Sequence, residues 1–195
     1  MNFKILLCVL VGGFSVSGWA INYTLETPSP DGRFALRLDP LGVENEDEMD
    51  AAIVVRATNA TLAKLPNTRL RNYDGCRLVW TADSKRVAFT GGGQFESRTR
   101  VFFWNGKGFR EIPLPAMPKP AFKFRGKDGE VGVYSDFITP VRWLKSGALL
   151  ISREMTMRRE STVYEGKLVV TMAFTAKQRA TIEEVKRAAI VAELF

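Results

Sequence analysis

Guanidinium groups and indole rings are the side chains of this sequence best suited to contact a ligand, because the usual catalytic residues are scarce. The chain of 195 residues contains no histidine and only two cysteines. A Ser-His-Asp or Cys-His nucleophile, a histidine general base and a histidine-containing zinc site are therefore impossible. No Cys-x-x-Cys, Walker-type, Gly-x-Ser-x-Gly or dinucleotide-binding glycine motif occurs either. We predict a protein that is not an enzyme and that uses no metal or cofactor.

Arginines gather in two short stretches, SRTR at residues 97–100 and SREMTMRRE at residues 152–160. The planar guanidinium fork binds carboxylate and phosphate groups through paired hydrogen bonds. A tryptophan beside the Asn105-Gly106 turn adds an aromatic ring that can stack on a partner. The candidate binding residues are Arg98, Arg100, Trp104, Arg153, Arg158 and Arg159. The alternative for the arginines is a solvated strand edge without a ligand.

Charge is unevenly distributed along the chain. The formal net charge is +7, and it falls to +6 without Lys4. Residues 39–50 contain six acids and no base, so the rest of the chain after residue 20 carries +12. This excess favours an anionic partner, with solvated loops as the alternative explanation. The acidic run from Glu44 to Asp50 lacks the glycine and terminal glutamate of an EF-hand loop, so we expect no calcium site there.

The N-terminal segment is typical of an export signal. Lys4 is followed by the apolar run ILLCVLVGGF and the small residues of SVSGWA. The apolar run is shorter than the roughly 20 residues that a membrane-spanning helix needs. We therefore predict a signal peptide at residues 1–20, a mature chain that starts near Ile21, and a periplasmic or secreted protein. An uncleaved anchor is the alternative. Cleavage leaves Cys76 as the sole cysteine, so no intramolecular disulfide is expected.

A turn motif with flanking strands occurs three times, as SPDGRFALRL, TADSKRVAFTG and LKSGALLIS. Alignment on Trp80 and Trp143 superimposes the second and third copies, and the first copy has Pro28 at the position of the tryptophan. Proline, aspartate and glycine in SPDG are typical of a type I turn. We therefore interpret Asp31 and Asp83 as turn-forming residues rather than ligands.

Each turn motif is followed by a second hairpin signal, which gives four strands per unit. The units span about 21–70, 71–115 and 130–187, within one β-repeat domain at 21–195. A connector at 113–124 contains four prolines and is expected to be extended. The repeat length of fifty to sixty residues is that of a propeller blade. The predicted fold is all-β, with three blade-like four-stranded antiparallel units and a short C-terminal helix or none; we favour a strand through about Val185.

The segments SPDGRFAL, WTADSKRVAF and TRVFFWNGKGFREIPL resemble the WD40-like repeats of TolB-type bacterial β-propellers. The resemblance extends from Thr27 to Arg187. It implies a partial propeller and a protein partner in the cell envelope, and it carries over no catalytic residue. The sequence departs from that pattern in three ways. The third copy has Lys145-Ser146-Gly147 without the aspartate, the first copy lacks the tryptophan, and three units are fewer than a closed ring requires.

These observations predict an exported, non-catalytic β-repeat module that binds a protein partner in the envelope. A carboxylate-dependent envelope enzyme, or an enzyme subunit, is one alternative. A basic module that adheres to an anionic envelope polymer is another. We expect no nucleic acid partner and no membrane span after signal cleavage. We also expect a monomer, with a dimer as the alternative. The acidic run and the proline connector are expected to blunt open strand edges, and the apolar tail AAIVAELF is expected to cover an open face.

Overall fold

A computed structural model describes residues 24–40, 49–65, 77–122, 124, 130–160 and 162–194. The predicted signal peptide, Cys76 and most of the acidic run from Glu44 lie outside these residues. The described chain consists of strands, turns and extended segments, which confirms the all-β class. No helix in these ranges is long and apolar enough to cross a membrane.

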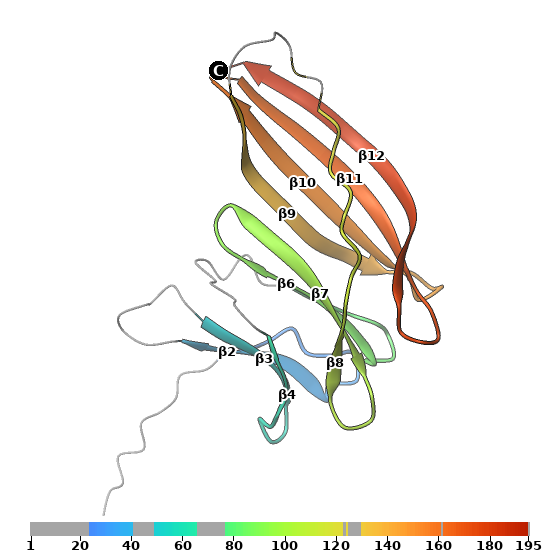
Figure 1. The fold of residues 1–195 in the computed structure, drawn as a ribbon. Coiled ribbons are helices and arrows are strands. Elements are labelled where there is room, and N and C mark those ends of the chain that lie inside the picture. The colour runs from blue at the N-terminus through green and yellow to red at the C-terminus, as the bar shows by residue number, and fades with distance from the viewer. Residues whose placement is uncertain are drawn as a thin grey trace, which may run out of the picture.

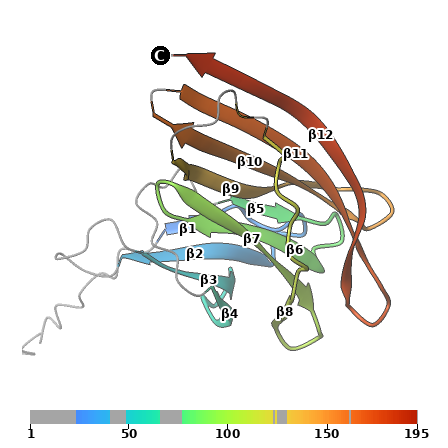
Figure 2. The ribbon, with the colours of Figure 1, turned by 45° about the horizontal axis from the view of Figure 1, so that its top comes forward.

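The first four strands form an antiparallel sheet of their own (Figures 1 and 2). They are β1 (Thr24–Glu26), β2 (Phe34–Pro40), β3 (Met49–Val55) and β4 (Thr61–Leu65), and they lie in chain order across the sheet. Phe34, Leu36 and Leu38 of β2 belong to one hydrophobic core, as expected for alternate side chains on one face of a strand, and the small Ala35 between them is also buried.

The other eight strands form one larger sheet. It contains β5 (Arg77–Trp80), β6 (Arg86–Gly92), β7 (Glu96–Trp104), β8 (Phe109–Ile112), β9 (Val131–Trp143), β10 (Leu149–Arg159), β11 (Thr162–Phe174) and β12 (Ala180–Leu194). The strands follow the order β12-β11-β10-β9-β7-β6-β5, and β8 pairs with β7 outside this path. From β5 to β8, and again from β9 to β12, strands that are consecutive in sequence pair in antiparallel fashion.

The second and third predicted units are therefore not separate sheets, which corrects the expectation from the sequence. Strand β8 is short and pairs only with residues 101–104 of β7. Strand β8 does not reach Glu96 and Ser97 on the same edge of β7. These two residues pair in parallel with Asp136 and Phe137 of β9. In the described part of the chain the two sheets do not close into a ring.

Two hydrophobic cores lie on opposite faces of the middle strands. The first joins β2, β3 and β4 to β6, β7 and β8, and the second joins β6, β7 and β8 to β9, β10 and β11. Val87 and Phe89 belong to the first core, and Ala88 between them belongs to the second. Because successive side chains of a strand point to opposite faces, β6 is buried on both.

The connector between β8 and β9 crosses the face of β10 and β11 as an extended chain (Figures 1 and 2). It lies so close to β11 that a Cβ atom added to Gly166 would come within 2.6 Å of Pro120 and 2.8 Å of Phe122. The glycine is therefore required for the connector to lie against the sheet.

The C-terminal segment is a strand through Leu194, so the expected strand is confirmed and extends beyond Val185. The backbone of the tail pairs with β11 as far as Thr162↔Leu194. The tail therefore continues the sheet as its last strand and does not lie over a face, contrary to expectation. The monomer was expected from this cover and from the acidic run and the proline connector as further seals, and it stays a prediction.

Candidate functional site

The three repeated motifs form the same backbone turn. The amides of Gly32, Ser84 and Gly147 donate to the carbonyl oxygen three positions earlier at 2.8–2.9 Å. The φ angles of these residues are 72°, 58° and 84°. A left-handed conformation favours glycine, and the second copy adopts it with serine. The repeat alignment made from the sequence therefore matches equivalent turn positions.

Aspartates complete the first two turns. One carboxylate oxygen of Asp31 accepts hydrogen bonds from the Ser29 hydroxyl at 2.7 Å and from the amide two positions later at 3.1 Å. Asp83 accepts equivalent bonds from the Thr81 hydroxyl at 2.6 Å and from the amide two positions later at 3.0 Å. These contacts support the interpretation of both aspartates as turn-forming residues.

The same contacts set the ionisation of the two carboxyl groups. Burial raises the pKa of Asp31, but hydrogen bonds from the neighbouring hydroxyls and from Arg33 outweigh it and bring the pKa to about 2. The Thr81 hydroxyl lowers the pKa of Asp83, and burial opposes this change only in part. Both groups are therefore anionic at neutral pH.

Each tryptophan of the repeat reaches back to the unit before it. The indole Nε1 of Trp80 donates to the Thr27 carbonyl at 3.0 Å, and that of Trp143 donates to the Val79 carbonyl at 2.8 Å. The two acceptors occupy the same position of the repeat, one residue before Pro28 and one before Trp80.

The turns themselves are also linked. The Asp31 amide donates to the Ser84 hydroxyl at 3.1 Å, which joins the first turn to the second. The Arg86 guanidinium donates to the Gly147 carbonyl at 3.1 Å, which joins the second turn to the third. The three turns, separated in sequence by more than fifty residues, therefore meet at one end of the molecule.

A hollow of about 700 Å³ lies where the turns meet. It is lined by Pro30, residues 79–83, Arg86 and residues 142–147. We call this the turn-end hollow. Its size is within the range of small-ligand and side-chain pockets in proteins. Arg142 and Lys145 on its wall are exposed, and their side chains form no hydrogen bond or ion pair within the described residues.

The arginines singled out from the sequence serve different roles. The Arg153 guanidinium is buried and binds both carboxylate oxygens of Asp136, at 2.9 and 2.8 Å. Its third nitrogen donates to the connector carbonyls of Met117 and Pro118, at 2.6 and 2.9 Å. Arg98 contacts the same carboxylate at 3.3 Å. Arg153 therefore fixes the connector to the sheet, and its side chain is buried rather than directed at solvent.

Two further candidates also have partners within the protein. Arg100 forms an ion pair with Glu111 across β7 and β8 at 3.2 Å. Trp104 packs in the first core, with ring centroids 5.1 Å from Phe34 and 5.2 Å from Phe109. The ring of Trp104 thus supports the packing of the two sheets.

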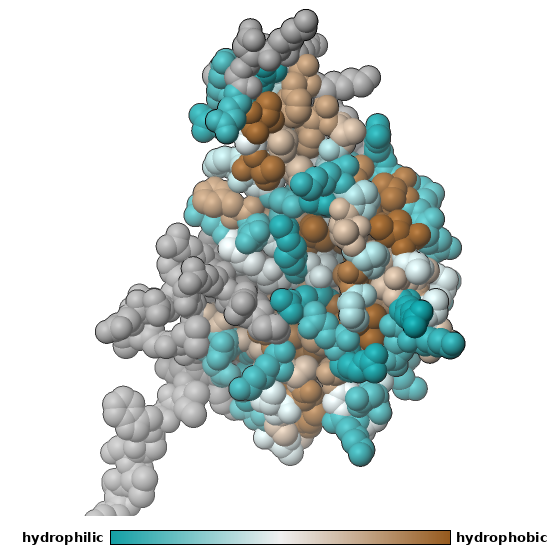
Figure 3. All heavy atoms as spheres, in the orientation of Figure 1, coloured by the Kyte–Doolittle hydropathy of each residue, from teal (hydrophilic) through white to brown (hydrophobic). Residues whose placement is uncertain are grey.

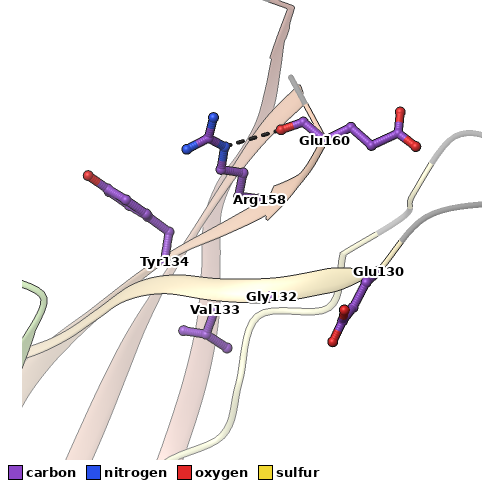
Figure 4. A pocket seen from close by; sticks show the side chains of 6 residues that line it. All are labelled: Glu130, Gly132, Val133, Tyr134, Arg158 and Glu160. Atoms are coloured by element: carbon purple, nitrogen blue, oxygen red, sulfur yellow. Dashed lines mark hydrogen bonds between the residues drawn. The ribbon is translucent and has the colours of Figure 1, made fainter.

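The last two candidates lie at the far end of β10. Arg158 is exposed beside a shallow hollow of about 420 Å³, where its Nε donates to the Glu160 carbonyl at 3.1 Å (Figure 4). Tyr134 also lines this hollow, and its side chain is 52% exposed. Arg159 is buried. The six candidates therefore do not gather on one surface, and only Arg98 and Arg153 share a partner among the described contacts.

Residues 142 and 145, on the wall of the turn-end hollow, were not singled out from the sequence. They flank the third turn motif, so the repeat alignment contained the relevant signal. No group of three or more potential metal-ligating side chains occurs among the residues that the structure describes. No protein-family model matches the chain, and no curated protein matches its sequence.

Proposed function

We propose that this chain is an exported, non-catalytic β-repeat module that binds a protein partner in the cell envelope through its turn end. The observation that carries the proposal is the meeting of all three repeat turns around one hollow. Turns on a rigid sheet scaffold are common positions for binding residues.

The three groups of four strands are, in this proposal, blade-like units of a partial β-propeller of the TolB type. Two features support it. Each core joins strands of one unit to strands of the next, and the tryptophan hydrogen bond recurs between successive units. The parallel pairing of β7 with β9 is the departure from a stack of separate blades.

The chemistry of the hollow indicates an acidic partner surface. Arg142 and Lys145 present unpaired positive charges on its wall, and the indoles of Trp80 and Trp143 line it. Arginine and tryptophan are enriched among residues that dominate binding energy at protein interfaces. A carboxylate side chain of a partner could form an ion pair with either cation.

The test compares two charge changes of equal size. Chemical crosslinking in the native envelope, followed by purification, is performed with wild type, with R142E/K145E and with K119E/R158E. The second variant alters two exposed cations away from the turn end. A partner crosslinked by wild type should be lost with R142E/K145E and kept with K119E/R158E. The reverse pattern would place binding on the connector and the far end of β10 and would contradict the proposal.

A further inference from the structure

Strand β12 forms one edge of the larger sheet. It pairs with β11 on one side and is the last strand in the sheet order. All side chains from residue 181 to 187 are exposed, including Ile182 at 36% and Val185 at 44%. Hydrophobic and hydrophilic side chains are interspersed over the right-hand margin in Figure 3, where Figure 1 shows β12. An exposed edge strand offers unpaired backbone donors and acceptors to another strand.

The order of charges in this edge is self-complementary. The sequence Glu183-Glu184-Val185-Lys186-Arg187 carries two acids on one side of a valine and two bases on the other. If two copies pair in antiparallel fashion about Val185, residue 184 lies opposite residue 186 and residue 183 lies opposite residue 187. Every charge then faces its opposite, which stabilises cross-strand pairs. Parallel pairing in register would place like charges side by side.

We propose that β12 pairs with β12 of a second copy of this chain, in antiparallel fashion about Val185, and joins two sheets into one. A twofold interface uses the same surface of both subunits, so it requires a segment that complements itself. The centre of the interface is the exposed Val185, with Ile182 of each strand near its ends. This inference concerns a different surface from the turn-end hollow and does not depend on the proposed partner.

The pairing is expected to be weak and dependent on concentration. The register of β12 against β11 shifts at residues 183 and 188, which leaves four regularly paired residues between two bulges. Bulges and charged side chains limit the pairing of an edge strand. An exposed ion pair of 3.1 Å between Glu184 and Lys186 within the strand must also give way to pairs between strands.

Sedimentation velocity over an about hundredfold range of protein concentration tests the proposal. Wild type should change from monomer to dimer as concentration rises. K186E/R187E makes the segment wholly acidic and should raise the dimer dissociation constant at least about tenfold. The full reversal E183K/E184K/K186E/R187E restores complementarity and should dimerise like wild type. R142E/K145E should leave dimerisation unchanged.

A mixing experiment separates lost pairing from lost folding. E183K/E184K is wholly basic in this segment and should be monomeric alone, as should K186E/R187E. An equimolar mixture of the two should form a heterodimer, because each acid then faces a base. Any of three results would overturn the proposal. Wild type could stay monomeric at every concentration, dimerisation could be the same in all charge variants, or the mixture could stay monomeric.

Discussion

The two junctions between successive units share a tryptophan contact, a link between turns and a hydrophobic core, and they differ in backbone pairing and buried charge. In both, a tryptophan indole of the later unit donates to the backbone carbonyl at the same repeat position of the earlier unit. The first junction also contains the hydrogen bond from the Asp31 amide to the Ser84 hydroxyl. Side-chain packing joins the two sheets there, in a ring cluster of Phe34, Trp80, Trp104 and Phe109.

The second junction adds backbone pairing and buried charge. Strands β7 and β9 pair in parallel, and the Asp136 carboxylate joins Arg98 of β7 to Arg153 of β10. The connector carbonyls bind the same Arg153. The comparison shows that the tryptophan contact recurs at both junctions, whereas parallel strand pairing and a buried ion pair occur only at the second among the described residues.

The largest expected effect comes from breaking the buried ion pair between Asp136 and Arg153 at the second junction. D136N leaves the buried Arg153 guanidinium without an anion and should lower the free energy of unfolding by about 3 to 5 kcal/mol. E111Q, which removes the exposed partner of Arg100, should cost less than about 1 kcal/mol. Urea denaturation of both variants checks this. Equal losses would mean that Asp136 contributes no more than a surface carboxylate.

Replacing the turn glycine at the same junction should have the next largest effect. G147A forces a left-handed alanine and places its Cβ 2.8 Å from the Arg86 guanidinium that donates to this turn. G106A has a similar φ, with open space around the added methyl. We expect a loss of about 1 kcal/mol for G106A and about 2 kcal/mol for G147A. Identical melting curves would show that the link from Arg86 to the third turn does not stabilise the junction.

The shared tryptophan contact can be compared directly between junctions. W143F and W80F each remove an indole donor and keep an aromatic ring. W143F should cost about 1 kcal/mol, because its hydrogen bond is partly buried. W80F should cost less, because its hydrogen bond is exposed to water. Thermal unfolding gives both values. A larger loss for W80F would mean that the exposed hydrogen bond of Trp80 stabilises the protein more than the partly buried one of Trp143.

The turn aspartate of the second unit should have a modest effect. D83A removes an acceptor for the Thr81 hydroxyl and for the following amide, and should cost about 1 kcal/mol. Asp83 also lines the turn-end hollow, but its carboxylate accepts hydrogen bonds within the turn, so crosslinking of the partner should be kept at a temperature where the variant is folded. Unchanged stability with lost crosslinking would show that Asp83 acts as a binding residue.

The smallest effect is expected at acid pH, where the contribution of Asp31 to stability is lost. The pKa of Asp31 in the folded protein is about 2, below its ordinary value of 3.8. The unfolded state therefore binds more protons in this range, so the contribution of Asp31 to stability is complete above about pH 5 and decreases as pH falls towards 2. D31N should flatten the dependence of stability on pH between these values, as measured by urea denaturation. If the free energy of unfolding falls equally with decreasing pH in D31N and in wild type, this assignment is wrong.

Much of the strand and turn content could be predicted from the sequence, because its signals are local. The turn residues, the Asn105-Gly106 hairpin and the equivalence of Trp80 with Trp143 depend on a few neighbouring positions. The pairing of β7 with β9 could not be predicted in this way. It depends on the shortness of β8 and on an open stretch of edge that no local pattern reports.

The candidate site was harder to predict for the same reason. Arg153 and Arg158 look alike in the sequence, but one is buried against Asp136 and the other is exposed. Which arginine meets a carboxylate depends on the register between strands distant in the chain. The exposed cations near the third turn flank the repeat motif in the sequence, but the hollow beside them forms only where residues of all three turn motifs meet.

The connector held by Arg153 has a consequence for the order of folding. The antiparallel groups β1–β4, β5–β8 and β9–β12 are three meanders. Each meander consists of hairpins whose strands are close in sequence, so these can form early and independently. The connector carbonyls of residues 117 and 118 find their donor thirty-five or more residues later, after β10 has formed. During synthesis from the N-terminus, the connector must therefore wait as an open chain until the last meander is made. We expect its docking to be a late event, with D136N slowing that phase while the earlier meanders form at unchanged rates.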